Sequence, residues 1–137
     1  VILIDKPLNW TSFQVVNKVR WLIRQHYGLK KLKVGHAGTL DPLATGLLIL
    51  CTGAMTKSIE EFQGQEKKYT GRLKLGATTP SYDLETEINA TFNYAHITVE
   101  MLHEALPQFT GTILQKPPIF SAIKNHSSEL LIIACNL

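Results

Sequence analysis

The stretch from Gly35 to Leu48 combines residue types that could do chemistry. Three glycines, His36 and a single carboxylate, Asp41, lie there among small and apolar residues. Because Pro42 follows Asp41, the aspartate backbone is restricted to an extended or turn conformation. The glycines permit positive φ angles or close approach by another backbone. The stretch therefore predicts a tight loop that presents a carboxylate between hydrophobic runs, and such loops often carry binding and catalytic groups.

Simpler interpretations of the same two residues stay open. An aspartate followed by proline is also a good helix N-cap, with the proline at the first helical position. Asp41 could have that role and a chemical one together. His36 could equally be a polar loop residue whose hydrogen bonds are satisfied within the loop.

The spacing of apolar residues predicts the elements that must position this loop. Strands are expected at residues 1–4, 47–51, 67–76 and 110–115. Helices are expected from a capping box at residues 11–14 to a stop at Gly28, at 54–62, and at 99–106 after the cap Thr98. In the strand at 67–76, Tyr69 shares a face with two leucines. It should therefore point inward as a core residue, unless it borders a cleft.

Composition places the 137-residue chain among globular proteins, with 45% hydrophobic and 18% charged residues. We expect one domain with no dividing linker. No apolar run approaches the roughly 20 residues of a membrane span, and Lys6 and Trp10 interrupt the apolar start, so no signal peptide is visible. The two distant cysteines suggest neither a disulfide framework nor a metal motif, which fits the cytoplasm. The first residue, Val1, is not Met, which predicts a fragment or a processed product.

Positive charge is concentrated just before the candidate loop. Residues 1–40 contain seven basic residues and one acidic residue, although the net charge of the chain is only +3. A positive field beside a candidate site suggests an anionic partner, with nucleic acid the first choice. Lys30, Lys31 and Lys33 lead directly into the loop and could hold phosphates. A solvated helix face is the alternative explanation of the cluster.

Residues 35–48 resemble the active-site motif of the tRNA pseudouridine synthase B (TruB-like) family. Three further segments agree in order with the family's opening, second and later motifs. These segments are Asp5–Pro7 with Thr11 and Ser12, Lys68–Gly71, and Pro117–Lys124. The resemblance covers about residues 1–124. It implies an α+β pseudouridine synthase fold, with a mixed, mostly antiparallel sheet flanked by helices.

The resemblance also implies a reaction, the isomerisation of uridine to pseudouridine at position 55 in the T loop of tRNA. Asp41 matches the catalytic aspartate, which could attack C1′ or remove a sugar proton. His36 and Tyr69 match residues that contact the RNA beside the extruded uridine. Lys6 joins the three loop lysines as a candidate phosphate contact. The family resemblance implies no metal and no organic cofactor, a monomeric cytoplasmic enzyme, no membrane, and the T arm of tRNA as partner.

The sequence departs from the family pattern after Lys124. Residues 125–137 form an apolar tail that does not match, for which a frameshift or a misassembled terminus is the preferred explanation. The family's downstream arginine, which pairs with the catalytic aspartate, has no counterpart in this chain. We therefore expect a sheet that is incomplete at the C-terminal end, with exposed edges, an apolar tail and poor solubility.

That departure keeps a second hypothesis open, a catalytically inactive RNA-binding fragment. A third hypothesis, an aspartyl-phosphate enzyme, comes from the spacing of Asp41 and Thr45. It is disfavoured because Leu43 occupies the position where such a site needs a second carboxylate.

Overall fold

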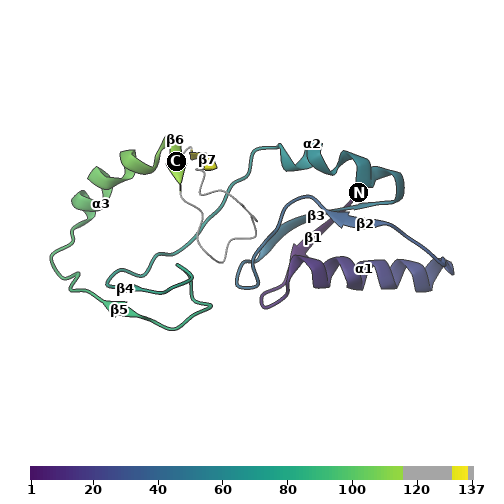
Figure 1. Ribbon diagram of the computed structural model, residues 1–137, viewed down its shortest axis with the longest axis horizontal. Helices are drawn as coiled ribbons and strands as arrows, with labels where there is room; N and C mark the ends of the chain where they lie inside the picture. Colours follow the sequence, from purple (N-terminus) through teal and green to yellow (C-terminus); the bar gives the residue numbers. More distant parts are fainter. Residues whose placement is uncertain (116–130, 136–137) are drawn as a thin grey trace. The chain divides into compact units, whose positions relative to one another are not determined.

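The computed structural model describes residues 1–115 and 131–135, and it divides the chain into two compact units, Val1–Thr70 and Gly71–Leu137. The expectation of one domain with no dividing linker stays a prediction. Residues 66–74 have no regular secondary structure (Figure 1). The sequence offered no glycine- or proline-rich linker at this place, so the division could not be seen from composition.

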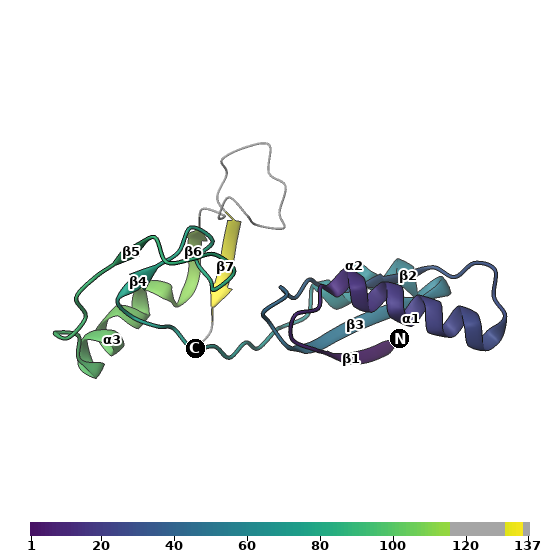
Figure 2. The same cartoon turned by 90° about the horizontal axis from the view of Figure 1, so that it is seen from below.

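The first unit is built on a three-stranded antiparallel sheet in the order β1-β3-β2. The strands are β1 (Ile2–Lys6), β2 (Val34–His36) and β3 (Gly46–Thr52). Ile4 pairs with Leu48, and His36 pairs with Leu50. Helix α1 (Ser12–Tyr27) covers one face of this sheet in both views (Figures 1 and 2). The predicted strands at 1–4 and 47–51 are confirmed, and each is slightly longer than expected.

The predicted ends of helix α1 are both confirmed. The side chain of Thr11 accepts a hydrogen bond from the backbone N–H of Gln14, and the Gln14 side chain accepts one from the backbone N–H of Thr11. Gly28 ends the helix in the left-handed conformation, with φ of 62°. These caps satisfy backbone groups that the helix itself leaves unpaired.

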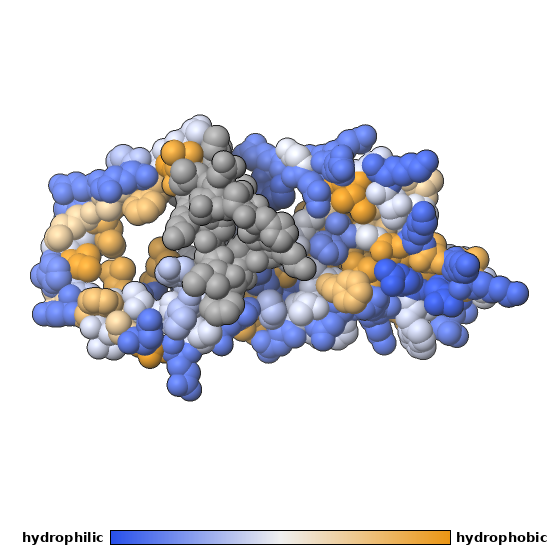
Figure 3. Space-filling view, in the orientation of Figure 1, coloured by the Kyte–Doolittle hydropathy of each residue, from blue (hydrophilic) through white to orange (hydrophobic). Residues whose placement is uncertain are grey.

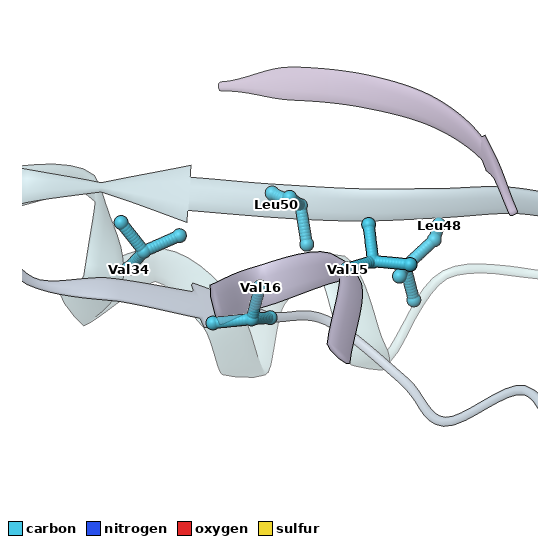
Figure 4. Close-up of a cluster of buried hydrophobic side chains, with 5 residues drawn as sticks. All are labelled: Val15, Val16, Val34, Leu48 and Leu50. Carbon is cyan, nitrogen blue, oxygen red and sulfur yellow. The ribbon is translucent and has the colours of Figure 1, made fainter. Parts of the chain in front are cut away.

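The core of this unit lies between α1 and the sheet. Val15 and Val16 from the helix pack against Val34, Leu48 and Leu50 from the strands (Figure 4). Burial of each such side chain contributes about 1.5–3 kcal/mol. Because β3 is the central strand, its alternate residues are the most deeply buried. The neighbouring Cys51 is also fully buried, and its thiol is free.

Part of the opposite face, at Gly35, is covered by a 3-10 helix, Gly53–Ser58, that continues into α2 (Ile59–Gln63). Elsewhere on that face Leu3 and Leu47 are 64% and 63% exposed. The predicted helix at 54–62 is confirmed in outline, although its first half is a 3-10 helix. Gly35 makes this packing close, since a Cβ atom there would lie 2.7 Å from Cδ1 of Ile59. The first of the three loop glycines therefore lies in close contact with α2, and an added Cβ would require the end of the Ile59 side chain to shift.

The second unit contains two pairs of short antiparallel strands. One pair is β4 (Ala77–Thr78) with β5 (Ala90–Thr91), and the other is β6 (Gly111–Gln115) with β7 (Leu131–Cys135). Helix α3 (Val99–Ala105) and a 3-10 helix (Leu106–Phe109) precede β6. The predicted cap is confirmed, because the side chain of Thr98 accepts a hydrogen bond from the N–H of Met101. The described chain is thus α+β, and its described strand pairs are antiparallel.

The structure does not describe the late motif, and it does not contain the strand expected at residues 67–76. The motif at Pro117–Lys124 and most of the expected tail lie outside the described residues, whereas Leu131–Cys135 forms β7. The strand expected at 67–76 is wrong, because Leu73 is 96% exposed and no strand lies between the end of β3 at Thr52 and the start of β4 at Ala77. Alternation alone predicted that strand, but a strand also needs a neighbour to complete its hydrogen bonds. Within the described residues, no helix has both the length and the hydropathy to cross a bilayer.

Candidate active site

Asp41 occupies the first position of a tight turn. The backbone N–H of Ala44 donates a hydrogen bond to the carbonyl oxygen of Asp41 at 3.0 Å. Pro42 takes the second position, where its fixed φ favours the turn. No helix follows, so the interpretation of Asp41 as a helix N-cap is wrong. The side chain of Asp41 is exposed, and the turn therefore presents the carboxylate to solvent.

The backbone on the N-terminal side of Asp41 is held by Ser12. The hydroxyl of Ser12 accepts a hydrogen bond from the N–H of Leu40 at 2.9 Å. It also donates one to the carbonyl oxygen of Leu40 at 3.0 Å. Ser12 is only 3% exposed and lies in the first turn of α1. One buried hydroxyl thus fixes both backbone groups of the residue before Asp41.

The backbone on the C-terminal side of Asp41 is held by Lys6. Its ammonium group donates hydrogen bonds to the carbonyl oxygens of Trp10 at 2.5 Å, Pro7 at 3.0 Å and Pro42 at 3.4 Å. Three acceptors match the three N–H donors of the ammonium group, which offsets the cost of burying its charge. Pro42 receives a second hydrogen bond, at 2.8 Å, from the N–H of Asn9.

These contacts correct the expectation that Lys6 binds RNA phosphate. Its side chain is fully buried, and its three protons are directed at backbone carbonyl groups. A phosphate could not reach it without opening the loop. The structural role of Lys6 is to join the opening segment of the chain to the turn that carries Asp41.

His36 ends β2 and is half-buried. Its Nδ1 lies 2.5 Å from the carbonyl oxygen of Gly38. A carbonyl oxygen can only accept, so Nδ1 donates this hydrogen bond, and Nε2 is the ring nitrogen that remains for a ligand. Gly38 has φ of 112°, a conformation that L side chains rarely adopt. The second loop glycine is therefore needed for its backbone, as the sequence predicted.

The other expected site residues, Tyr69 and three lysines, take no part in the hydrogen bonds that hold the Asp41 turn. Tyr69 is 72% exposed and lies in the segment without regular structure, so the expectation of an inward, core tyrosine is wrong. Lys30, Lys31 and Lys33 are exposed in the loop between α1 and β2. Hydrophilic residues crowd the end of the molecule where this loop lies (Figure 3). The N–H of Gly53 donates to the carbonyl oxygen of Lys33 at 2.9 Å, which fixes the end of the loop.

Sequence reasoning missed the two anchors. Lys6 and Ser12 were noted as parts of a motif, but nothing in the spacing showed that both reach the backbone beside Asp41. A signal was present for Ser12, because the capping box uses Thr11 and leaves the next hydroxyl without a local partner. Among the described residues, no group of three or more His, Cys, Asp and Glu side chains could hold a metal ion.

The arrangement is suited to chemistry that needs a fixed carboxylate. An exposed carboxylate can act as a nucleophile or accept a proton. Its effectiveness depends on being held in position before the substrate arrives. Here the backbone is held on both sides of Asp41, while its side chain remains accessible.

Comparison with known proteins gives a consistent result. The model of the TruB family pseudouridylate synthase N-terminal domain matches residues 24–135. This range includes Asp41 and extends past Lys124, where the sequence suggested that the likeness ends; that boundary stays a prediction.

Curated relatives called tRNA pseudouridine synthase B are similar over most of the chain. The protein of Flavobacterium johnsoniae is 63% identical over 131 residues, which are 95% of this chain and 57% of the relative. That of Phocaeicola vulgatus is 62% identical over 124 residues, 90% of this chain and 53% of the relative. That of Chlorobium luteolum is 48% identical over 133 residues, 97% of this chain and 45% of the relative. The chain spans about half the length of the curated relatives it matches.

Proposed function

Since this chain belongs to the TruB family of pseudouridylate synthases, we propose that it converts uridine to pseudouridine in tRNA, with Asp41 as the catalytic carboxylate. The observation that carries the proposal is the doubly anchored turn, which presents Asp41 to solvent within the sequence that matches the family. The target is a T-loop uridine, position 55, as the sequence resemblance implies. The described sheet then forms part of the mixed, mostly antiparallel pseudouridine synthase sheet.

The reaction is an isomerisation that needs no co-reactant. The N1–C1′ bond of the uridine breaks, the base turns, and a C5–C1′ bond forms, while the proton on C5 is replaced by one on N1. Asp41 either attacks C1′ or removes a sugar proton. In both cases the nucleotide must leave the base stack to reach the carboxylate, and the exposed turn leaves Asp41 accessible to it.

Other residues supply contacts to the RNA under this proposal. Nε2 of His36 can form a hydrogen bond with the RNA, and the exposed ring of Tyr69 can stack on a base. Lys30, Lys31 and Lys33 are available to phosphates. Under this proposal the protein acts as a monomer on the T arm of tRNA in the cytoplasm and uses no metal or cofactor. Light scattering with and without tRNA measures the oligomeric state.

The test compares the chain with its Asp41→Asn variant on an unmodified tRNA transcript. Pseudouridine is detected by carbodiimide modification followed by primer extension. We expect product from the unaltered chain and none from Asp41→Asn. Asp5→Asn is a matched control, because Asp5 is also exposed but lies on β1, and it should retain activity. Equal product from Asp41→Asn and the unaltered chain would refute the role of Asp41.

The alternative is a catalytically inactive RNA-binding chain, which the departure of residues 125–137 from the family pattern keeps open. A gel shift with T-arm RNA distinguishes the two proposals. Salt-dependent binding without pseudouridine formation would support the alternative and overturn catalysis by this chain. Absence of both binding and product would overturn both proposals.

A further inference from the structure

A depression of about 300 Å³ lies at the start of α1, and the described residues that line it are Trp10, Gln14, Asn17 and Lys18. None of these residues belongs to the expected active site. Trp10 is 38% exposed, so part of its indole ring is accessible from solvent. The depression therefore combines an aromatic surface with two amides and one ammonium group.

The polar lining of this depression offers hydrogen-bond donors. The amide oxygen of Gln14 accepts from the backbone N–H of Thr11 at 2.8 Å. The amide oxygen of Asn17 accepts from the guanidinium of Arg20 at 3.1 Å. Each oxygen thus already accepts one hydrogen bond, and the donors that the lining offers a ligand are the two NH₂ groups and the ammonium of Lys18. No carboxylate is among the described lining residues, so the depression is suited to a ligand rich in acceptors or negative charge.

The ammonium of Lys18 and the backbone of Trp10 have defined contacts. The ammonium of Lys18 lies 5.0 Å from the ring centroid of Trp21, a cation–π contact that limits where it can go. The carbonyl oxygens of Trp10 and Pro42 both lie within 3.4 Å of the ammonium nitrogen of Lys6. The depression is therefore tied to the turn that carries Asp41 through one shared buried group.

We propose that this depression is a second nucleotide-binding site, which takes a nucleotide of the RNA substrate other than the one that Asp41 acts on. The base stacks on Trp10, its carbonyl or ring-nitrogen acceptors bind the amides of Gln14 and Asn17, and a phosphate binds Lys18. A flat ring, several acceptors and a charged phosphate are the features that this lining complements. The excess of basic residues in 1–40 favours RNA over a neutral ligand. This inference rests on the proposed function.

The test uses fluorescence, because Trp10 and Trp21 are the two tryptophans of the chain. In the chain carrying Trp21→Phe, Trp10 becomes the sole reporter. We expect an unlabelled T-arm hairpin to quench its emission with a saturable, salt-dependent curve. Trp10→Ala, followed by gel shift, should weaken binding about tenfold, the usual scale for the loss of one stacked base. Circular dichroism confirms that each variant is folded.

A pair of lysine variants separates this site from general charge attraction. Lys18→Gln should weaken binding several-fold and reduce the slope of log affinity against log salt by about one. Lys57→Gln removes the same charge from the exposed 3-10 helix and should leave binding at the Lys18 site intact. Binding of the hairpin without quenching of Trp10, or equal effects of the two lysine variants, would overturn the inference.

The quenching assay for this site and the pseudouridine assay for the proposed function can give different outcomes. Asp41→Asn should leave the quenching of Trp10 unchanged, because Asp41 is not among the lining residues of the depression. Pseudouridine formation without quenching would overturn this site alone. Quenching without pseudouridine formation would overturn catalysis and support the nucleotide site.

Discussion

Replacing Ser12 with alanine removes the hydroxyl that holds the backbone before Asp41. The variant loses two hydrogen bonds to Leu40, of 2.9 and 3.0 Å. A neutral hydrogen bond contributes about 1 kcal/mol net, and alanine recovers a few tenths as a better helix former. We therefore expect the free energy of unfolding to fall by about 2 kcal/mol. With a urea slope of about 2 kcal/mol per molar, the midpoint should fall by about 1 M.

Urea unfolding followed by tryptophan fluorescence measures this change, because both tryptophans lie in the unit Val1–Thr70. Ser58→Ala is the matched control, since the hydroxyl of Ser58 makes no cap hydrogen bond at the start of α2. It should change the free energy by less than about 0.5 kcal/mol. Amide exchange at Leu40 should accelerate in Ser12→Ala. Equal midpoints for the two variants, with unchanged exchange at Leu40, would refute the anchoring role of Ser12.

Three further predictions address other contacts. Lys6→Met should lower the free energy of unfolding by about 3 kcal/mol, because it leaves buried carbonyl groups unpaired; an unchanged urea midpoint would show that the ammonium group does not hold the loop. Gly38→Ala should lower the free energy of unfolding by about 1–3 kcal/mol, because φ of Gly38 is 112°. Gly64→Ala is the control: φ of Gly64 is −75°, so the free energy of unfolding should change by less than about 1 kcal/mol. Thermal melts compare the two variants, and equal melting temperatures would contradict the strain at Gly38. The hydroxyl of Ser81 donates to Asp83 and is the largest cause that lowers the Asp83 pKa below 3.8. Because the folded state lowers this pKa, the ionised Asp83 contributes stability above pH 3.8, and the contribution is lost as the pH falls through the lowered pKa. Ser81→Ala should raise the pKa of Asp83 in an NMR titration, and an unchanged pKa would show that the Ser81 hydroxyl is not its cause.

Several elements could be predicted because short-range interactions decide them. The capping box at Thr11 and the left-handed Gly28 set both ends of α1. Apolar runs set β1 and β3, and Thr98 sets the start of α3. In each case the deciding contacts join residues a few positions apart, so the order of residues contains the information.

The segment at 67–76 shows why alternation was not enough. Its pattern predicted a half-buried strand with Tyr69 inward, yet Tyr69 and Leu73 are largely exposed. A strand is stabilised by hydrogen bonds and side-chain pairs across to a neighbour. Whether a neighbour is in place depends on the path of the whole chain, which alternation does not describe.

The sequence by itself determined that Asp41 lies in a turn after His36 and before a buried strand, and that a basic segment precedes it. Only the tertiary structure decided that Ser12 and Lys6 hold that turn, that Lys6 is buried away from solvent, and that the chain forms two units. The hydrogen bonds concerned join residues 28 and 36 positions apart. The Ser12 bonds exist because α1 packs on the sheet, and the Lys6 bond exists because β1 pairs with β3, the strand that follows the turn. Contacts over such separations follow from packing and strand pairing rather than from local preference.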